Sequence, residues 1–566
     1  MAVRIPVVEN GHNRELSTQE PGGAAVQGLM QDFPLTLAHV FHRAEKLFPK
    51  KRIVTATATG LEETTYGEWA DATRRLASAL DELGVSEDGR VGTFAWNSAH
   101  HLQLYFGVPC SGRVLHTLNI RLFPEQLVYS INHAGDEVLF VDRTLIAKLW
   151  PLADKLSGIK HFIVMDDGSG DIPDDPRVLS FDEVTSGSKP AEFSELDERR
   201  GAAMCYSSGT TGDPKGVVYT HRSIVLHSLV CMGADALGIS EKDVLLPVVP
   251  MFHVNAWGLP FSGVFAGSSF VFPGPNMTPE PLVELIAKHK VTVAAGVPTI
   301  WMGVLGALDG HDVSSLRAIP CGGSAVPKSL SEGFREKTGL PILHAWGMTE
   351  TSPIGSVCTI KSSLASQTES ELADLRSSQG LPVALVEARI AEAASGEELP
   401  WDGEAFGELQ VRGPFIASGY YDDDRSKDSL TDDGWFRTGD VATIDPEGYI
   451  RIVDRTKDLI KSGGEWISTV ELENELMSHP AVAEAAVIAA AHSKWQERPL
   501  ACVVLEDGEE EDKDALRSHL ESRVAKFWLP DDYVFIDEIP KTTTGKFSKK
   551  DLRERFTDYK LPTEGA

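Results

Sequence analysis

The sequence contains few cysteines, and none of them stands in a Cys-x-x-Cys pair. The six cysteines are scattered over positions 110, 205, 231, 321, 358 and 502. This spacing argues against a disulfide framework and against a cysteine-based zinc site, which need paired or closely spaced cysteines. We therefore predict reduced thiols in the core of a cytoplasmic protein.

Long apolar runs are also absent, because no stretch reaches the about 18 residues that a membrane-spanning helix needs. The longest candidate, residues 481–491, is interrupted by Glu484. Residues 1–33 mix Glu, Asn, Gln, Gly and Arg without an apolar centre, which is not typical of a signal peptide. We predict no integral membrane segment and a loose N-terminal leader over residues 1–33.

Basic residues are scarce beside acidic ones: 53 Lys and Arg stand against 83 Asp and Glu, a net charge of −30. Such a surface repels nucleic acids and anionic membranes, so we predict no nucleic acid partner. To bind an anionic substrate, such a protein would need cationic side chains that are clustered in one place.

The order of the expected elements indicates an α/β protein of more than one domain, since 566 residues exceed what one core usually serves. Strand-like runs alternate with amphipathic stretches such as residues 68–83, which favours largely parallel sheets. The strand-like runs cover residues 90–94, 137–141, 161–165, 291–297 and 341–344. We therefore expect a large N-terminal domain over residues 34–456.

Two later parts of the chain have a different pattern. In residues 407–413 and 448–453, apolar and polar side chains alternate as in the strands of a small antiparallel unit, and turn formers stand at both ends of each run. This pattern predicts a β-barrel-like subdomain. After that, a helix over residues 468–477 and strands over 483–490 and 500–505 predict a separate α+β C-terminal domain, residues 457–566.

Residues 207–216, Ser-Ser-Gly-Thr-Thr-Gly-Asp-Pro-Lys-Gly, have the composition of a phosphate-binding loop. Glycines allow backbone N–H groups to approach an anion, the hydroxyls add donors, and Lys215 adds a positive charge. Apolar runs on both sides predict a loop between two strands, whereas a Walker A loop opens a helix and ends in Gly-Lys-Ser/Thr. The expected phosphate ligands are Ser207, Ser208, Gly209, Thr210, Thr211, Gly212 and Lys215.

Several further motifs follow in a fixed order and together resemble the acyl-adenylate-forming enzymes, which include acyl-CoA synthetases, luciferases and peptide-synthetase adenylation domains. The resemblance spans roughly residues 35–556. Its motifs are Pro250-Met-Phe-His253, Gly322-Gly-Ser324, His344-Ala-Trp-Gly-Met-Thr-Glu350, Gly407-Glu-Leu, Trp435-Phe-Arg-Thr-Gly-Asp440, Asp454-Arg-Thr-Lys-Asp458 and Pro540-Lys-Thr-Thr-Thr-Gly-Lys546. It implies two parallel-type α/β subdomains in the N-terminal domain and a C-terminal domain that rotates between two half-reactions.

The resemblance implies that a carboxylate attacks the α-phosphorus of ATP to give acyl-AMP and pyrophosphate, after which coenzyme A takes the acyl group. Lys546 matches the family lysine that bridges the carboxylate and the α-phosphate. Two anions must meet in this step, which explains the need for positive charge and Mg²⁺. Glu350 would hold Mg²⁺ together with Thr211, and Thr349 would lie near the α-phosphate; a helix N-cap is the alternative role for Glu350.

The remaining nucleotide contacts are also implied by the resemblance. Asp440 would accept hydrogen bonds from both ribose hydroxyls, and Arg455 would join it at the ribose or a phosphate. The adenine slot would be lined by Gly322, Gly323, Ser324, Ala345, Trp346 and Gly347. A buried core position is the alternative for Trp346. Lys457 occupies the hinge position, and Lys461, in Lys461-Ser-Gly-Gly-Glu-Trp466, would enter for the second half-reaction.

Residues 253–260 are the basis for predicting which kind of carboxylic acid is the substrate. Amino-acid-activating relatives place an aspartate here to pair with the substrate amine, but this segment has no acidic residue. A neutral or apolar acid is favoured, because a buried unpaired ammonium is expensive. Trp257 is bulky and points to short or medium chains. The expected substrate contacts are His253, Asn255, Trp257, Gly258, Gly322, Gly347 and Met348.

The whole pattern is similar to medium-chain fatty acyl-CoA ligases and 3-methylmercaptopropionate-CoA ligases. His253 would gate the path between the acyl site and the thiol; a packed core histidine is the alternative. The sequence also leaves open transfer to a carrier protein, an aryl-CoA ligase, an oxygen-using light emitter, a non-catalytic scaffold and a homodimer.

Overall fold

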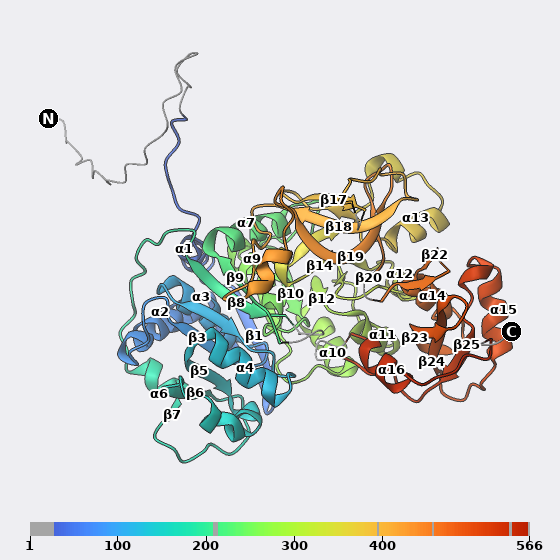
Figure 1. Cartoon of the computed structure of the whole chain (residues 1–566). Coiled ribbons are helices and arrows are strands. Elements are labelled where there is room, and N and C mark those ends of the chain that lie inside the picture. The colour runs from blue at the N-terminus through green and yellow to red at the C-terminus, as the bar shows by residue number, and fades with distance from the viewer. Residues whose placement is uncertain are drawn as a thin grey trace. The chain divides into compact units, whose positions relative to one another are not determined.

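The computed structural model describes residues 28–207, 213–392, 395–455, 458–463, 465–542 and 546–563 (Figure 1). Its contacts divide the chain into Met1–Pro34 and one compact unit, Leu35–Ala566. The fold described below is that of the compact unit. No helix among the described residues is both long and apolar enough to cross a membrane.

The first large sheet has seven strands in the order β7-β6-β5-β3-β4-β8-β9, and only β8 and β9 pair antiparallel. The strands are β3 (Arg90–Phe94), β4 (Val114–Thr117), β5 (Asp136–Asp142), β6 (His161–Met165), β7 (Val178–Ser180), β8 (Gly201–Tyr206) and β9 (Gly216–Thr220). Its connecting helices include α2 (Tyr66–Glu82), α3 (Ala99–Cys110), α4 (Pro124–Ala134) and α6 (Phe181–Ser186). The prediction of a largely parallel α/β sheet is confirmed.

The second large sheet has the order β12-β10-β11-β1-β2, again parallel except for the hairpin of β1 and β2. Its strands are β1 (Arg52–Thr57), β2 (Gly60–Thr65), β10 (Val244–Pro247), β11 (Ser269–Phe272) and β12 (Val293–Ala295). The helices of this part are α1 (Leu37–Leu47), α7 (His221–Met232), α9 (Leu259–Ala266), α10 (Pro279–His289), α11 (Pro298–Ala307) and α12 (Lys328–Thr338). Two parallel-type α/β subdomains are therefore present, as expected.

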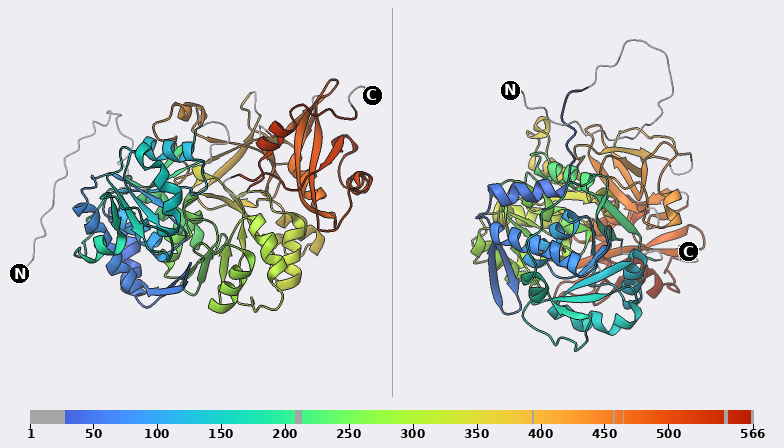
Figure 2. Two further views of the ribbon diagram at one scale, coloured as in Figure 1. Left: turned by 90° about the horizontal axis from the view of Figure 1, so that it is seen from below. Right: turned by 90° about the vertical axis from the view of Figure 1, so that its left-hand side faces the viewer.

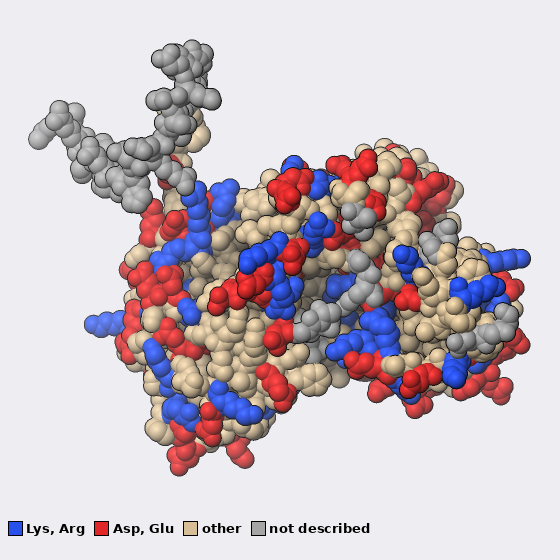
Figure 3. All heavy atoms as spheres, viewed as in Figure 1, with Lys and Arg blue, Asp and Glu red and all other residues tan. Residues whose placement is uncertain are grey.

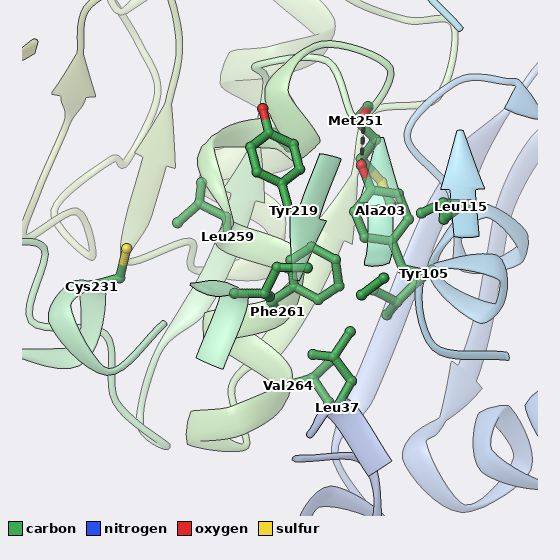
Figure 4. Packing of buried hydrophobic residues seen from close by; sticks show 14 of the residues in the cluster. Leu37, Tyr105, Leu115, Ala203, Tyr219, Cys231, Met251, Leu259, Phe261 and Val264 are labelled. Carbon is green, nitrogen blue, oxygen red and sulfur yellow. Dashed lines mark hydrogen bonds between the residues drawn. The ribbon is translucent and has the colours of Figure 1, made fainter. Parts of the chain in front are cut away.

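Helices α3 and α9 bring the two sheets into one hydrophobic core. Tyr105 of α3 and Phe261 of α9 are both fully buried, with ring centroids 5.1 Å apart. The Tyr105 hydroxyl donates to the carbonyl oxygen of Met251 at 2.5 Å, the dashed contact in Figure 4. A buried hydroxyl needs such a partner, and this bond ties the core to the chain just before His253.

Two smaller sheets follow. One joins β13 (Pro320–Cys321), β14 (Leu343–Gly347), β15 (Ile354–Val357) and β16 (Leu381–Pro382), with α13 (Glu369–Arg376) before β16. The other is antiparallel and joins β17 (Glu387–Ala391), β18 (Phe406–Arg412), β19 (Phe436–Ile444) and β20 (Ile450–Arg455). The predicted barrel-like subdomain is thus a four-stranded antiparallel sheet with β17 and β20 at its ends.

The chain after residue 458 builds a sheet and a core of its own, seen in orange to red in the left view of Figure 2. Its strands are β21 (Ile460–Ser462), β22 (Glu465–Ile467), β23 (Val482–His492), β24 (Gln496–Leu505) and β25 (Asp532–Phe535). Its helices are α14 (Thr469–Leu476), α15 (Lys513–Glu521) and α16 (Lys549–Arg555). This is the expected α+β arrangement.

The local boundaries differ from the predicted ones by a few residues. Helix α2 begins at Tyr66, two residues early, because Thr65 and Glu68 form a capping box. Strand β12 is shorter than the predicted run 291–297, and β14 lies later than the predicted run 341–344. All six cysteines are free and buried, as predicted.

Candidate active site

The phosphate loop lies between two strands, as predicted, because β8 and β9 form an antiparallel pair around it. Two hydrogen bonds close its base: the Ser207 amide donates to the Lys215 carbonyl at 2.9 Å, and the Lys215 amide donates to Ser207 Oγ at 3.1 Å. The predicted ligands Ser208, Gly209, Thr210, Thr211 and Gly212 lie outside the described residues. The described ends place Lys215 at the rim of the loop.

Lys215 and Glu350 meet through one aromatic side chain. The Lys215 ammonium lies 4.4 Å from the centroid of the Tyr420 ring, and the Tyr420 hydroxyl donates to Glu350 Oε1 at 2.8 Å. Glu350 is only 6% exposed. Burial raises the pKa of this carboxyl, while the Tyr420 hydrogen bond and the charges of Arg455 and Lys215 act in the opposite sense.

The backbone around Glu350 is held from two sides. Thr349 and Glu350 form a short 3-10 turn, η3 (Thr349–Thr351), directly after β14. The Tyr219 hydroxyl donates to the Thr349 carbonyl at 2.7 Å, and the Ala417 amide donates to the Glu350 carbonyl at 2.7 Å. This support fixes where the Glu350 side chain can lie.

Asp440 is a buried carboxylate that contacts two donors, one cationic and one neutral. It lies on β19 opposite Arg455 on β20, whose Nε is 3.1 Å from Asp440 Oδ1. Trp346 Nε1 donates to Asp440 Oδ2 at 2.8 Å. Each carboxylate oxygen has two lone pairs, so Asp440 can still accept from a ligand. Trp346 is half-buried and takes part in this cluster instead of filling the core alone.

The backbone at residues 322–324 passes very close to β14. A Cβ atom added at Gly322 would lie 2.2 Å from the carbonyl oxygen of Ala345, so only glycine fits there. A Cβ added at Gly323 would lie 3.6 Å from Lys546 Cε. Ser324 is exposed. The glycine backbone at residues 322–323 is therefore next to Lys546, which comes from the last part of the chain.

Lys546 is brought to this site from a segment far along the chain. Its carbonyl accepts from the Thr542 amide at 2.7 Å, and its amide donates to Thr542 Oγ1 at 3.2 Å. Burial, helped by the charge of Arg455, lowers the pKa of Lys546 to about 8, although Asp440 and Glu350 act to raise it. The structure therefore assembles the predicted lysine, aspartate, glutamate and arginine in one place.

The segment after His253 has an unusual backbone. Residues Val254–Trp257 all have φ between +45° and +58°, which makes a left-handed turn that non-glycine residues rarely adopt. Asn255 within it accepts a hydrogen bond from Cys205 Sγ at 3.4 Å. The turn carries the half-buried Trp257 ring to within 3.8 Å of a Cβ position at Gly322. A residue predicted for the acid pocket therefore lies next to a residue predicted to bind the nucleotide.

His253 itself carries no positive charge at neutral pH. Burial, together with the charges of Lys546 and Arg121, lowers its pKa to about 3. Met348 is half-buried, and its amide donates to Thr351 Oγ1 at 3.0 Å. Gly347 lies against the Pro353 carbonyl, and Gly258 lies against the His227 ring.

Lys461 is not among the groups brought together. Its side chain is exposed, its ammonium lies 5.3 Å from the Trp466 ring centroid, and its amide donates to Glu497 at 2.9 Å. These partners all belong to the C-terminal part. The predicted hinge residue Lys457 lies outside the described residues.

Two residues that the sequence analysis does not single out also reach the site. Tyr420 has no sequence signal beyond its place after Gly419. Arg121 follows β4, the neighbour of β8, so its position at the same sheet edge as the phosphate loop could have been noticed. Its guanidinium lies 5.9 Å from the Phe252 ring centroid and makes no ion pair within the described part of the chain.

The charge of this region contrasts with that of the whole protein. Figure 3 shows Lys and Arg side chains gathered about a hollow in one face, although acidic side chains cover much of the rest. The cations described above are Arg121, Lys215, Arg455 and Lys546. In the portions of the chain that are described, no three His, Cys, Asp or Glu side chains gather as metal ligands. A metal at Glu350 would therefore need oxygens from a substrate or water.

Two family models match the chain. The model of the AMP-binding enzyme matches residues 41–421, and that of the AMP-binding enzyme C-terminal domain matches residues 471–546.

Proteins of known name show similarity over nearly the full length. A long-chain-fatty-acid–CoA ligase of Thermus thermophilus is 46% identical, covering 94% of this chain and 98% of the relative. A 3-methylmercaptopropionyl-CoA ligase of Ruegeria lacuscaerulensis is 44% identical, covering 94% and 99%. The crystal structure of the anthranilate CoA ligase AuaEII with anthranoyl-AMP superposes with a TM-score of 0.83 at 26% identity, covering 93% and 98%. The chain therefore belongs to the AMP-binding enzyme family.

Proposed function

We propose that this protein is an ATP-dependent acyl-CoA ligase for a short- or medium-chain carboxylic acid, such as a fatty acid or 3-methylmercaptopropionate. It forms acyl-AMP with release of pyrophosphate; the thiol of coenzyme A then bonds to the acyl carbon, and AMP leaves. The observation that carries the proposal is the position of Lys546 against Gly323, where Asp440, Glu350 and Arg455 act on its pKa. The six free, buried cysteines support a cytoplasmic location.

In the first step a carboxylate oxygen bonds to the α-phosphorus, and the bond from that phosphorus to the bridging oxygen breaks. Pyrophosphate leaves with the electron pair. Lys546 donates to the carboxylate and the α-phosphate, where negative charge develops, and Lys215 holds the departing phosphates with the loop. Arg455 lies beside Asp440 and adds positive charge near the nucleotide.

The residues present fit a magnesium ion. Glu350 is a buried carboxylate whose pKa burial raises, so a cation beside it would favour its ionised form. We assign Glu350, with Thr211 of the loop, as the residues that would hold Mg²⁺. When bound, Mg²⁺ neutralises phosphate charge and polarises phosphoryl oxygens.

The adenosine part of ATP is assigned to the cluster around Asp440. Asp440 accepts hydrogen bonds from the ribose hydroxyls. The adenine binds against the backbone of Gly322 and Ala345 and the Trp346 ring. The close approach at Gly322 supports this assignment, since a side chain there would collide with the Ala345 carbonyl.

We assign the second half-reaction to a rotation of the C-terminal domain about Lys457. Lys461 and the residues that follow it then face the acyl-AMP. The exposed position of Lys461 beside Trp466 supports this assignment, because the present arrangement places Lys546, and not Lys461, in the site.

Substitution of Gly463 by alanine is expected to slow thioester formation about tenfold and leave acyl-AMP formation nearly unchanged. Gly463 has φ +60°, and an added Cβ would lie 2.7 Å from the Trp495 ring, so the turn between β21 and β22 must shift. Single-turnover measurement of each half-reaction checks this. Gly508→Ala, at φ +91° with open space around it, is the matched control. Equal loss in both half-reactions would contradict the assignment.

The acid pocket is assigned to the left-handed turn that carries Trp257. The two named relatives differ widely in their acids, so the pocket residues decide the chain length. Trp257→Ala is expected to shift the preference toward longer acids, by about fourfold for each additional methylene that fills the freed space. Values of kcat/KM for a straight-chain series check this. Trp401→Ala, at a site 41% exposed, is the control; an unchanged series would remove Trp257 from the pocket.

The overall proposal is tested with a panel of straight-chain, branched, thioether and aromatic acids. Pyrophosphate release identifies the acid, and consumption of coenzyme A identifies the acceptor. Preference for aromatic acids would favour the aryl-CoA ligase. Pyrophosphate release without coenzyme A consumption, together with acylation of a phosphopantetheinylated carrier, would favour a carrier-loading enzyme.

A further inference from the structure

We propose that Tyr420 is a positioning residue that holds the Lys215 ammonium and the Glu350 carboxylate in a single arrangement for binding MgATP. The inference rests on the proposed function and adds a residue from the antiparallel part of the chain to the phosphate site. Tyr420 lies between β18 and β19, far in sequence from both groups that it contacts.

Tyr420 contacts the two groups with different parts of its side chain. The ring face carries the Lys215 ammonium at 4.4 Å from the centroid, within the range in which a cation is attracted to an aromatic ring. The hydroxyl donates to Glu350 Oε1 at 2.8 Å. One half-buried side chain therefore fixes the distance between a cation and a buried carboxylate.

The two held groups need this arrangement for chemical reasons. Lys215 forms no ion pair within the described residues, so its charge stays available for an incoming anion. Without the ring, a flexible lysine would be free to turn toward Glu350 and neutralise it. Tyr420 separates the two charges while orienting both, which prepares one for phosphate and the other for a cation.

The chain just after Tyr420 is tied to the C-terminal end of the phosphate loop. The Tyr421 amide donates to the Gly216 carbonyl at 2.8 Å, and Arg425 Nη1 donates to the Asp213 carbonyl at 3.1 Å. Asp423 orients Arg425, because its Oδ1 accepts a hydrogen bond from Arg425 Nε at 2.8 Å. Residues 421 and 425 therefore hold the described end of the loop, next to Tyr420.

The test is ATP binding to the full-length protein, without acid or coenzyme A, measured with and without Mg²⁺. Tyr420→Phe keeps the ring and removes the hydroxyl, so it is expected to weaken binding about 10- to 100-fold in Mg²⁺ and little without it. Tyr420→Leu also removes the ring, so it is expected to weaken binding a further 2- to 30-fold or so in both conditions.

Two controls separate positioning from general damage. Tyr449→Phe removes another hydrogen-bonded hydroxyl, which donates to the Thr359 carbonyl at 2.9 Å, and is expected to bind ATP like the wild type. In Glu350→Gln, the additional change Tyr420→Phe is expected to cost much less than in the wild type, because the two act as one unit.

Any of three results would overturn the inference. Tyr420→Phe could bind ATP as tightly as the wild type in Mg²⁺, or it could lose equal ATP affinity with and without Mg²⁺. The third is that the losses of ATP affinity from Tyr420→Phe and Glu350→Gln are fully additive. Failure of the proposed function is a separate result. In that case the wild-type protein would not bind ATP, or would bind it and form no thioester from any acid in the panel.

Discussion

Lys546→Ala is expected to lower acyl-AMP formation about 10²- to 10³-fold, the usual loss when a preorganised donor to developing charge is removed. The variant should still convert supplied acyl-AMP and coenzyme A to the thioester, because we assign Lys546 to the first half-reaction only. Pyrophosphate release measures the first step, and thioester formation from acyl-AMP measures the second. Loss of both steps together would contradict this role.

The same lysine predicts a pH dependence. Burial lowers the pKa of Lys546 to about 8, so the ammonium is present below this pH and is lost as the pH rises through it. The kcat/KM of the first half-reaction, which reports the free enzyme, should therefore fall above about pH 8. Lys546→Arg keeps its charge and should show no such fall, even if its overall rate is low. Lys549→Arg is unsuitable as a control, since Lys549 is ion-paired with Glu473 at 2.8 Å.

Asp440→Asn is expected to raise the KM for ATP about 10- to 100-fold, the effect of losing charge-assisted hydrogen bonds. The new amide group would face Arg455 or Trp346, which are both donors, so one contact becomes unfavourable. The KM for coenzyme A should change little. Steady-state kinetics with each substrate varied in turn separate the two constants.

A matched substitution checks the Asp440 prediction. Asp445 lies just after β19, and its Oδ1 accepts from the Glu447 and Tyr449 amides at 2.9 Å each. Asp445→Asn retains these bonds and should leave the KM for ATP unchanged. If Asp440→Asn also leaves it unchanged, the ribose contact must be assigned elsewhere.

Much of the fold was predictable because local patterns report backbone structure. The runs 90–94 and 161–165 coincide with β3 and β6, since alternating or continuous apolar residues bounded by turn formers define strands. The phosphate loop was predictable for the same reason, because its flanking apolar runs required a strand on each side. The precise start of α2 was not, because a capping box moved it to Tyr66.

The site was only partly predictable. Lys546, Glu350, Asp440 and Arg455 follow from ordered motifs, although no motif gives a distance. The left-handed turn at residues 254–257 has no glycine before Gly258, so sequence chemistry gives no sign of it. Tyr420 was missed because its two partners, Lys215 and Glu350, belong to other parts of the chain.

The fold class, the family resemblance and the residue types that ATP chemistry needs could all be predicted from the sequence, because they depend on local patterns and on motif order. The folded chain was needed to show that Lys546 lies beside Gly323, that Arg455 and Trp346 share Asp440, and that Tyr420 lies between Lys215 and Glu350. Apart from Arg455 and Asp440, which are partners on adjacent strands, these contacts depend on how separate parts of the chain pack together. Packing joins residues as far apart in sequence as Glu350 and Tyr420 or Gly323 and Lys546, and a local pattern carries no information about such pairs.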